Sequence, residues 1–173
     1  MRAWEGQLPP RGYTLLLPRG GSPGGETTLL IRNGTRFSEI DLKTGLHAAA
    51  ATISPEKTLT VCSLYLPPNS PVSKLSLAEL FGQLLKPFLV LGDFNAHFLA
   101  WGDSRRDGRG RMLEEFTDKN DLIILNSGSK LLFIRLIIRP QRLIWQWLHP
   151  PLPPNVPGLP TVICAAAITF QYF

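Results

Sequence analysis

The residues best suited to chemistry lie in the segment Leu91–His97, which reads Leu-Gly-Asp-Phe-Asn-Ala-His. It continues the apolar run Phe88–Leu91, which is typical of a buried strand. Side chains at the carboxyl end of such a strand converge on a cleft in α/β folds. Asp93 can therefore accept a proton from an attacking water, and Asn95 can donate to a phosphoryl oxygen. On these residues alone the alternative stays open that the Asp-x-Asn pattern is a turn capping the next element.

Four further side chains are candidates for the same site. Tyr65 ends a β-type run and is either a phosphate contact or an inward strand aromatic. His97 and Trp101 follow Asn95 closely and either shape a binding cleft or pack the loop. Arg105 opens a run in which arginines alternate with acids, a pattern usual for solvated surface, although some phosphate contacts are plausible there.

Alternating strands and helices are expected to position these groups. Leu77, Leu80, Leu84 and Leu85 fall on one face of a helix that begins at Ser76 and stops before Pro87. A second helix is predicted over Gly110–Lys119, with Met112, Leu113 and Phe116 inward. The predicted strands are Tyr13–Leu17, Thr27–Arg32, Leu46–Ile53, Thr58–Tyr65, Phe88–Leu91 and Leu122–Leu125. This alternation predicts a layered α/β sandwich.

The bulk composition excludes several classes of protein. With 173 residues, 44% hydrophobic and 18% charged, the chain suits one globular domain and not a disordered one. Cys62 and Cys164 are too few and too far apart for a disulfide framework or a zinc site. No secretory signal is recognised, and no apolar run approaches the roughly 20 residues of a membrane helix. We therefore expect an intracellular chain without a membrane partner.

The end of the chain is unlike the rest. After position 121 there is no Asp or Glu, but Lys130, Arg135, Arg139 and Arg142 remain, so most of the net charge of +5 comes from this end. The basic pI is therefore weak evidence for DNA binding. Prolines follow in quick succession from Pro150, and proline interrupts helices and central strands. We predict a partial domain over residues 10–129 and an unstructured, proline-rich tail over 130–173.

Several ordered motifs resemble one known family. Over about residues 10–129 the chain resembles the endonuclease domain of non-LTR retrotransposons of the LINE/jockey type, within the endonuclease/exonuclease/phosphatase superfamily. The motifs that carry the resemblance are Pro10–Tyr13, Leu30–Asn33, Phe37–Ile40, Val61–Pro68, Phe88–His97, Trp101-Gly102, Asp107–Arg111, Glu115-Phe116, Asn120–Leu122 and Leu125–Gly128.

The resemblance implies a fold, an activity and partners. It implies a four-layer α/β sandwich and Mg²⁺-dependent hydrolysis of a DNA phosphodiester, the target-site nick that primes a reverse transcriptase domain. Tyr65 would contact the scissile phosphate, Asp93 would orient or deprotonate the water, and Asn95 would hold the phosphate oxygens. His97 and Trp101 would shape the DNA-binding cleft, and Arg105 stays a candidate phosphate contact on its charge pattern. A functional element would act in the nucleus.

The chain departs from the family pattern at two places. The family's domain opens with strands that carry an Asn and a metal-binding Glu, and it closes with Ile-Asp-Leu and Ser-Asp-His motifs; none of these is present. Glu5 and Glu26 lie in loop-like sequence and are not credible replacements. We therefore expect an incomplete sandwich without the N- and C-terminal strands, no metal ligands, and an inactive or nearly inactive fragment. The alternatives are a non-enzymatic module that binds nucleic acid or protein, and an unstable product.

A shift of reading frame explains the tail. Suitable codons for Arg142–His149, read two bases later, spell Ile-Asp-Leu, and suitable codons for Ala166–Tyr172 spell Ser-Asp-His at the same offset. Both missing motifs return in one frame and in the expected order. We therefore predict a frameshift near Ser129.

Overall fold

A computed structural model describes residues 11–18, 27–54, 58–99 and 103–124, together with two further strands, Leu136–Ile138 and Val162–Ala165. Within these residues the chain is a mixed α/β structure with two sheets and two helices. No helix in the described part is both long and apolar enough to span a bilayer.

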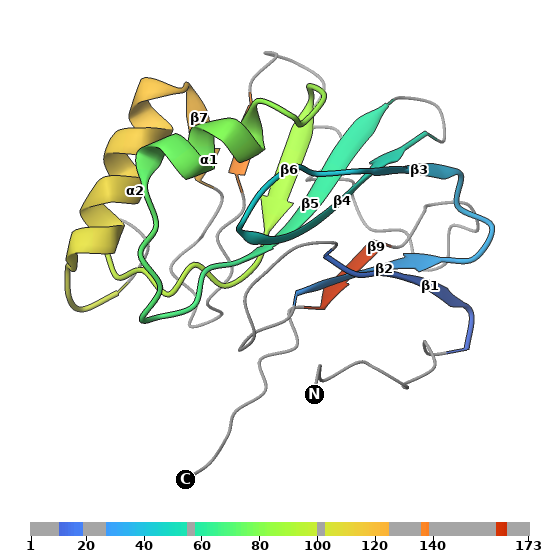
Figure 1. Cartoon of the computed structure of the whole chain (residues 1–173), viewed down its shortest axis with the longest axis horizontal. Helices are drawn as coiled ribbons and strands as arrows, with labels where there is room; N and C mark the ends of the chain where they lie inside the picture. Colours follow the sequence, from blue (N-terminus) through green and yellow to red (C-terminus); the bar gives the residue numbers. More distant parts are fainter. Residues whose placement is uncertain are drawn as a thin grey trace, which may run out of the picture.

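The larger sheet has six strands in the order β3-β4-β5-β6-β8-β7 (Figure 1). Its strands β5 and β6 are parallel neighbours, with Thr60 opposite Phe88 and Ser63 opposite Leu91. Helix α1 connects them, as parallel strands require a crossover. The remaining pairs of this sheet are antiparallel. The strands are β3 (Phe37–Ile40), β4 (His47–Ile53), β5 (Leu59–Tyr65), β6 (Phe88–Leu91), β7 (Leu122–Ile124) and β8 (Leu136–Ile138).

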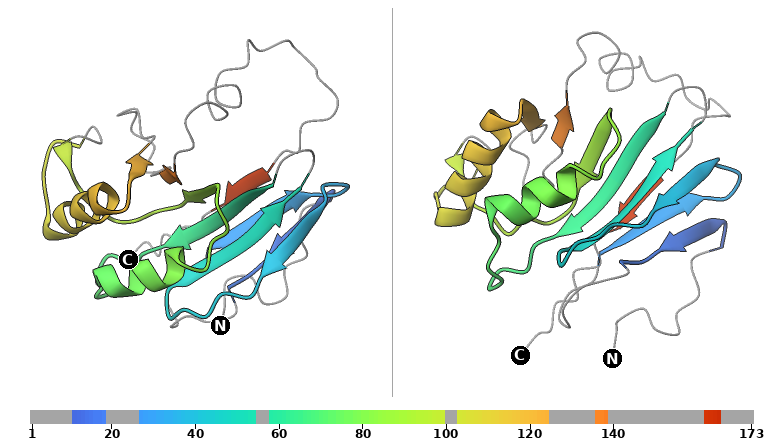
Figure 2. Two further views of the ribbon diagram at one scale, coloured as in Figure 1. Left: turned by 90° about the horizontal axis from the view of Figure 1, so that it is seen from above. Right: turned by 45° about the horizontal axis from the view of Figure 1, so that its top comes forward.

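The smaller sheet has the order β1-β2-β9 and packs against the six-stranded sheet on the side away from the helices (Figures 1 and 2). It contains β1 (Tyr13–Leu16), β2 (Thr28–Arg32) and β9 (Val162–Ala165), all antiparallel. Leu29 and Ile31 of β2 pack against Ala51 and Val61 of the larger sheet. The described residues therefore form three layers: helices, six-stranded sheet and three-stranded sheet.

Strands β4 and β5 are buried on both faces, and their side chains alternate between two cores. Ala48 and Ala50 of β4 face the helices, whereas Ala49 and Ala51 face the smaller sheet. The period of two residues in a strand produces this division. Small alanines on β4 let both layers approach the sheet closely. The continuous apolar character of these strands is the consequence of burial on both sides.

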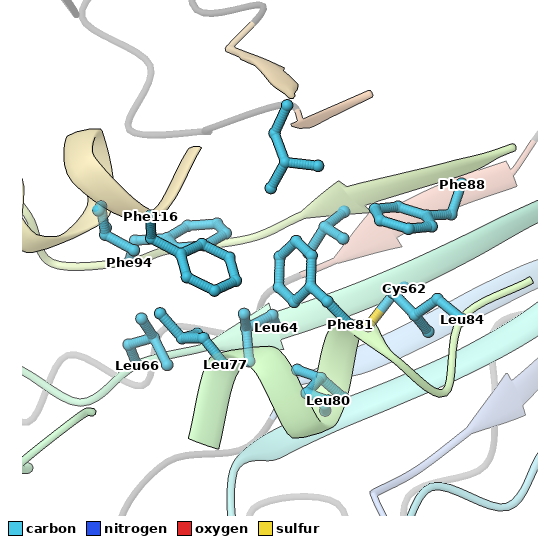
Figure 3. Packing of buried hydrophobic residues seen from close by; sticks show 14 of the residues in the cluster. Cys62, Leu64, Leu66, Leu77, Leu80, Phe81, Leu84, Phe88, Phe94 and Phe116 are labelled. Atoms are coloured by element: carbon cyan, nitrogen blue, oxygen red, sulfur yellow. The ribbon is translucent and has the colours of Figure 1, made fainter. Parts of the chain in front are cut away.

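The helices cover the sheet through an aromatic cluster (Figure 3). Helix α1 (Lys74–Phe81) is capped by Ser73, whose side chain accepts from the Ser76 backbone amide. Helix α2 (Gly108–Lys119) is capped by Asp107, whose Oδ1 accepts from the Gly110 amide at 2.6 Å. Phe81 stacks edge-on against Phe88 and Phe116, with ring centroids 5.5 and 5.3 Å away.

The predicted elements are confirmed, with changes at their boundaries. Helix α1 begins at Lys74 and ends at Phe81, so Leu84 is buried beyond the helix and Leu85 is 61% exposed. Helix α2 begins two residues before the predicted start because Asp107 caps it. Strand β3 was not predicted as a strand, since Ser38 and Glu39 make it a short, polar edge.

The predicted tail differs from the structure at two points. Within 130–173, a segment expected to be unstructured, β8 pairs with β6 and β7, and β9 pairs with β2. Both are short apolar runs, and the open edges of β2 and β6 supply unpaired backbone groups to which such runs can bond. That expectation is therefore corrected for these two strands, and the rest of the tail lies outside the described residues.

Candidate active site

The candidate site lies where the parallel strands β5 and β6 end. The loop after β5 and the loop after β6 run on from the same edge of the sheet (Figure 1). The backbone amide of Leu66 donates to the carbonyl of Asp93 at 2.9 Å, so the pairing continues past both strands. Tyr65 and Asp93, which are 28 positions apart in the sequence, are brought to one place by this parallel pairing.

Gly92 is needed for the close approach of the two strand ends. Its φ is +150°, and a Cβ built on it would lie 1.8 Å from the carbonyl oxygen of Leu64. A side chain here would push β6 away from β5. Glycine thus allows the chain to turn immediately after β6 and delivers Asp93 beside the end of β5.

Asp93 and Asn95 are joined in one turn. Asp93 is only 5% exposed, and its Oδ1 accepts from the Asn95 backbone amide at 2.9 Å. Asn95 has a positive φ of 46°, which asparagine tolerates better than most residues. Its side-chain Nδ2 donates to the Leu66 carbonyl at 3.0 Å. The turn that the Asp-x-Asn pattern left open as an alternative is therefore present. It also brings both polar side chains to the edge of the site.

The charge of Asp93 is poorly solvated. Burial raises the pKa of the Asp93 carboxyl above its ordinary value, and this effect exceeds the opposing influences of the Asn95 amide, Arg109 and His97. A carboxylate whose pKa is raised by burial is a better base than an exposed one. This environment suits a group that takes a proton from water.

Tyr65 is half-buried at the end of β5. Burial raises the pKa of its hydroxyl, and the nearby charge of Asp93 raises it further, while Arg109 acts in the opposite direction. The hydroxyl therefore remains protonated at neutral pH and can donate a hydrogen bond. Its ring meets His47 of the adjacent strand edge-on, with centroids 6.0 Å apart. Sequence reasoning missed His47, since only strand pairing brings it next to Tyr65.

His97 and Arg105 belong to a second cluster on the loop between β6 and α2. His97 Nδ1 lies 2.5 Å from Oδ2 of Asp103, and its Nε2 lies 2.9 Å from Nη2 of Arg105. With Arg105 donating to Nε2, Nδ1 carries the proton that bonds to Asp103. The hydrogen bond from His97 lowers the pKa of the Asp103 carboxyl. Arg105 and His97 are thus hydrogen-bonded to each other. Trp101, the remaining candidate of this loop, lies outside the described residues.

Arg109, the second residue of α2, was not singled out by the sequence. It was interpreted as one of several surface arginines, but its guanidinium is half-buried and bonds to both loops of the site. Its acceptors are the carbonyl oxygens of Leu66, Phe94, Asn95, Pro67, Pro68 and Ser70, at 2.7 to 3.4 Å. In the sequence, the one local feature that set Arg109 apart from the other arginines is its position between Gly108 and Gly110.

The described residues do not fit a metal centre. Among them, no group of three His, Cys, Asp or Glu side chains gathers in one place. Asp93 is buried near the guanidinium of Arg109, whose charge would oppose a cation there. A hard divalent cation prefers several oxygen ligands. What the site holds instead is one carboxylate, one amide and one phenol.

Comparison with known proteins finds similarity to one family and to two curated relatives. The family described as Endonuclease-reverse transcriptase matches residues 59–135, a range that contains all six candidate site residues. A curated relative, the RNA-directed DNA polymerase from mobile element jockey of Drosophila funebris, is 27% identical over 119 residues. That alignment covers 68% of this chain and 13% of the relative. The protein of the same name from Drosophila melanogaster is 33% identical over 72 residues, which are 42% of this chain and 8% of the relative.

A solved structure has the same fold. The endonuclease domain of TRAS1, a telomere-specific non-LTR retrotransposon, superposes with a TM-score of 0.62 at 20% identity, covering 73% of this chain and 65% of that one. The predicted fold class is therefore confirmed. The chain spans only a small part of the curated polymerases that it matches, so these comparisons concern one domain of a larger kind of protein.

Proposed function

We propose, on the premise that this chain is related to the endonuclease domains of non-LTR retrotransposons, that its site at the ends of β5 and β6 is built to bind and hydrolyse a DNA phosphodiester. The observation that carries the proposal is the convergence of Tyr65, Asp93 and Asn95 on one edge of the sheet. Endonucleases of this kind generally depend on a divalent metal ion, which stabilises the charge that develops on the phosphoryl group.

Each of the three side chains has a chemical task in this proposal. The protonated Tyr65 hydroxyl donates to a non-bridging phosphate oxygen. One N–H of the Asn95 side-chain amide is bonded to Leu66, and the other donates to the phosphate. Oδ1 of Asp93 is bonded to the Asn95 amide, so Oδ2 accepts the proton of the attacking water. The water oxygen then forms the new bond to phosphorus as the bond to the leaving sugar oxygen breaks, and the leaving oxygen takes a proton from solvent water.

The partners proposed for the chain follow from its relatives. The two curated relatives are named as RNA-directed DNA polymerases of a mobile element. We propose DNA as the substrate and a reverse transcriptase domain as the functional partner, which would use the nicked end as a primer. His97 and Arg105 would contribute to the DNA-facing surface of the loop before α2.

We also propose that this chain has little or no nicking activity, because its described site offers a single carboxylate beside a guanidinium. The test is incubation of purified chain with supercoiled plasmid and Mg²⁺, with an identically purified Asp93→Ala variant as control. The expected result is no nicking above the Asp93→Ala background. Mg²⁺-dependent nicking that disappears in Asp93→Ala would contradict inactivity and would directly support the endonuclease assignment.

The second candidate function is a non-enzymatic module that binds nucleic acid. The phenol and amide donors at the strand ends favour it, because they can bind a phosphate without any metal. Fluorescence anisotropy with a labelled duplex separates the candidates. Tyr65→Phe and Asn95→Ala should each weaken binding several-fold, whereas Arg11→Gln, in the turn before β1 of the smaller sheet, should not. Equal binding by all four proteins would exclude this site as a DNA contact, and a melting curve first establishes that each chain is folded.

A further inference from the structure

Arg109 joins the two loops that carry the candidate catalytic groups. Nη1 donates to the carbonyl oxygens of Leu66, Phe94 and Asn95 at 3.3, 3.2 and 3.4 Å. Nη2 donates to the carbonyls of Pro67 and Ser70 at 2.9 and 2.7 Å, and to that of Pro68 at 3.1 Å. One side chain thus contacts the backbone next to Tyr65 on one loop and next to Asp93 on the other.

The shape of the guanidinium explains why arginine occupies this position. Its planar fork carries five N–H donors in fixed directions, whereas the lysine ammonium carries three donors on one atom. Nη1 reaches carbonyls of both loops, and Nη2 adds three further carbonyls of the first loop. A lysine would keep the charge and most of the stem, but its single nitrogen could not make the bonds of both Nη1 and Nη2.

The charge of Arg109 also acts on the site. All of its described hydrogen-bond acceptors are backbone carbonyls, so no described carboxylate neutralises the positive charge in an ion pair. It lowers the pKa of the Asp93 carboxyl and of the Tyr65 hydroxyl, against the effect of burial. Arg109 therefore keeps Asp93 ionised more readily than burial alone would allow.

We propose, as an extension of the function proposed above, that Arg109 is a positioning residue, which holds the Tyr65 loop and the Asp93–Asn95 loop at a fixed separation from the start of α2. The backbone of Arg109 is itself fixed, because the start of α2 packs closely against the second loop. Gly110 follows it, and a Cβ on Gly110 would lie 2.1 Å from the carbonyl oxygen of His97. The Asp107 amide also donates to that carbonyl at 3.0 Å. The start of α2 is thus fixed against the second loop independently of the arginine side chain.

The experiment is carried out on the free protein, so its outcome does not depend on DNA cleavage. Arg109→Lys and Arg109→Met are compared with Arg111→Met, a control on the exposed face of the same helix. Two quantities are measured by NMR: the pKa of the Asp93 carboxyl, and the amide exchange rates of Leu66 and Asn95 relative to that of Cys62 in the core.

We expect the two substitutions to separate the effect of the positive charge from the effect of the hydrogen-bond geometry. Arg109→Met should raise the pKa of Asp93, whereas Arg109→Lys should leave it close to the wild-type value. Both should speed exchange of Leu66 and Asn95 at least tenfold more than exchange of Cys62, and Arg111→Met should change neither quantity.

Three results would overturn the inference. The first is unchanged exchange at Leu66 and Asn95 in Arg109→Lys, and the second is an equal increase at all three amides. The third is global unfolding of both variants, which would make Arg109 a residue of general stability. The nicking and DNA-binding assays test the proposed function separately, so failure of either can be told apart from failure of this inference.

Discussion

The side-chain amide of Asn95 donates a hydrogen bond to the backbone carbonyl of Leu66 at 3.0 Å, linking the loop after β6 to the residue after β5. The same carbonyl accepts from Arg109 at 3.3 Å. Leu66 itself is fully buried, so its backbone cannot bond to solvent instead. The separation between the two candidate catalytic loops is therefore set by polar contacts to a buried backbone group.

Replacement of Asn95 is expected to destabilise the fold through two distinguishable effects. Asn95→Ala removes the bond to Leu66 and keeps a Cβ at a φ of 46°, and it should cost about 2 kcal/mol of unfolding free energy. Asn95→Gly removes the same bond but relieves the backbone, and it should be less damaging by about 1 kcal/mol. Urea unfolding measures both, and equal losses would show that backbone conformation contributes nothing.

Gly92→Ala should disrupt the contact between β5 and β6. The added methyl would lie 1.8 Å from the Leu64 carbonyl oxygen, and alanine is strained at a φ of +150°. We expect a loss of more than about 3 kcal/mol of unfolding free energy, or failure to fold. Gly45→Ala is the matched control, since nothing lies within 4 Å of its Cβ position, and it should change stability by less than about 0.5 kcal/mol. Similar melting temperatures for the two variants would contradict the described approach.

Asp93→Asn should alter how stability depends on pH. The pKa of Asp93 is raised in the folded protein, so the unfolded chain releases this proton first as pH rises. The wild-type protein therefore loses stability as pH rises from the ordinary carboxyl pKa of about 3.9 through the raised value.

The asparagine variant lacks this loss and should be more stable than wild type near neutral pH, with the two converging below about pH 3. Asp103, whose lowered pKa acts in the opposite direction, is present in both proteins and cancels in the comparison. Chemical unfolding at several pH values measures the difference. A less stable Asp93→Asn protein at neutral pH would contradict the described burial.

The frameshift proposed for the tail is tested by the nucleotide sequence of the locus. Trp145 and Trp147 fix six of the bases used in the shifted Ile-Asp-Leu motif and its continuation, because tryptophan has one codon. The shifted frame should stay open past Phe173 and should spell both Ile-Asp-Leu and Ser-Asp-His. The family match reaches residue 135, so we expect the shift between Arg135 and Arg142, somewhat later than Ser129. Stop codons in that frame, or codons that spell neither motif, would refute the idea.

Much of the fold was predictable because its signals are local. Apolar runs such as Phe88–Leu91 and the helical spacing around Leu113 and Phe116 report burial directly, since the period of the pattern matches the period of the element. The motif around Asp93 and Asn95 indicated the resemblance to non-LTR retrotransposon endonucleases, which the comparisons confirm, and the edge of the sheet where chemistry is expected. The assigned roles of Tyr65, Asp93 and Asn95 remain predictions.

What only the tertiary structure decided depends on pairing between distant segments. His47 meets Tyr65 because β4 and β5 are antiparallel in one register, and β8 enters the sheet because β6 offers a free edge. Arg109 looks like any surface arginine in the sequence, since none of its acceptors lies within its own helix. Backbone carbonyls are present at every residue and leave no trace in the sequence. Which of them lie within reach of one guanidinium is settled only when β5, β6 and α2 are packed together.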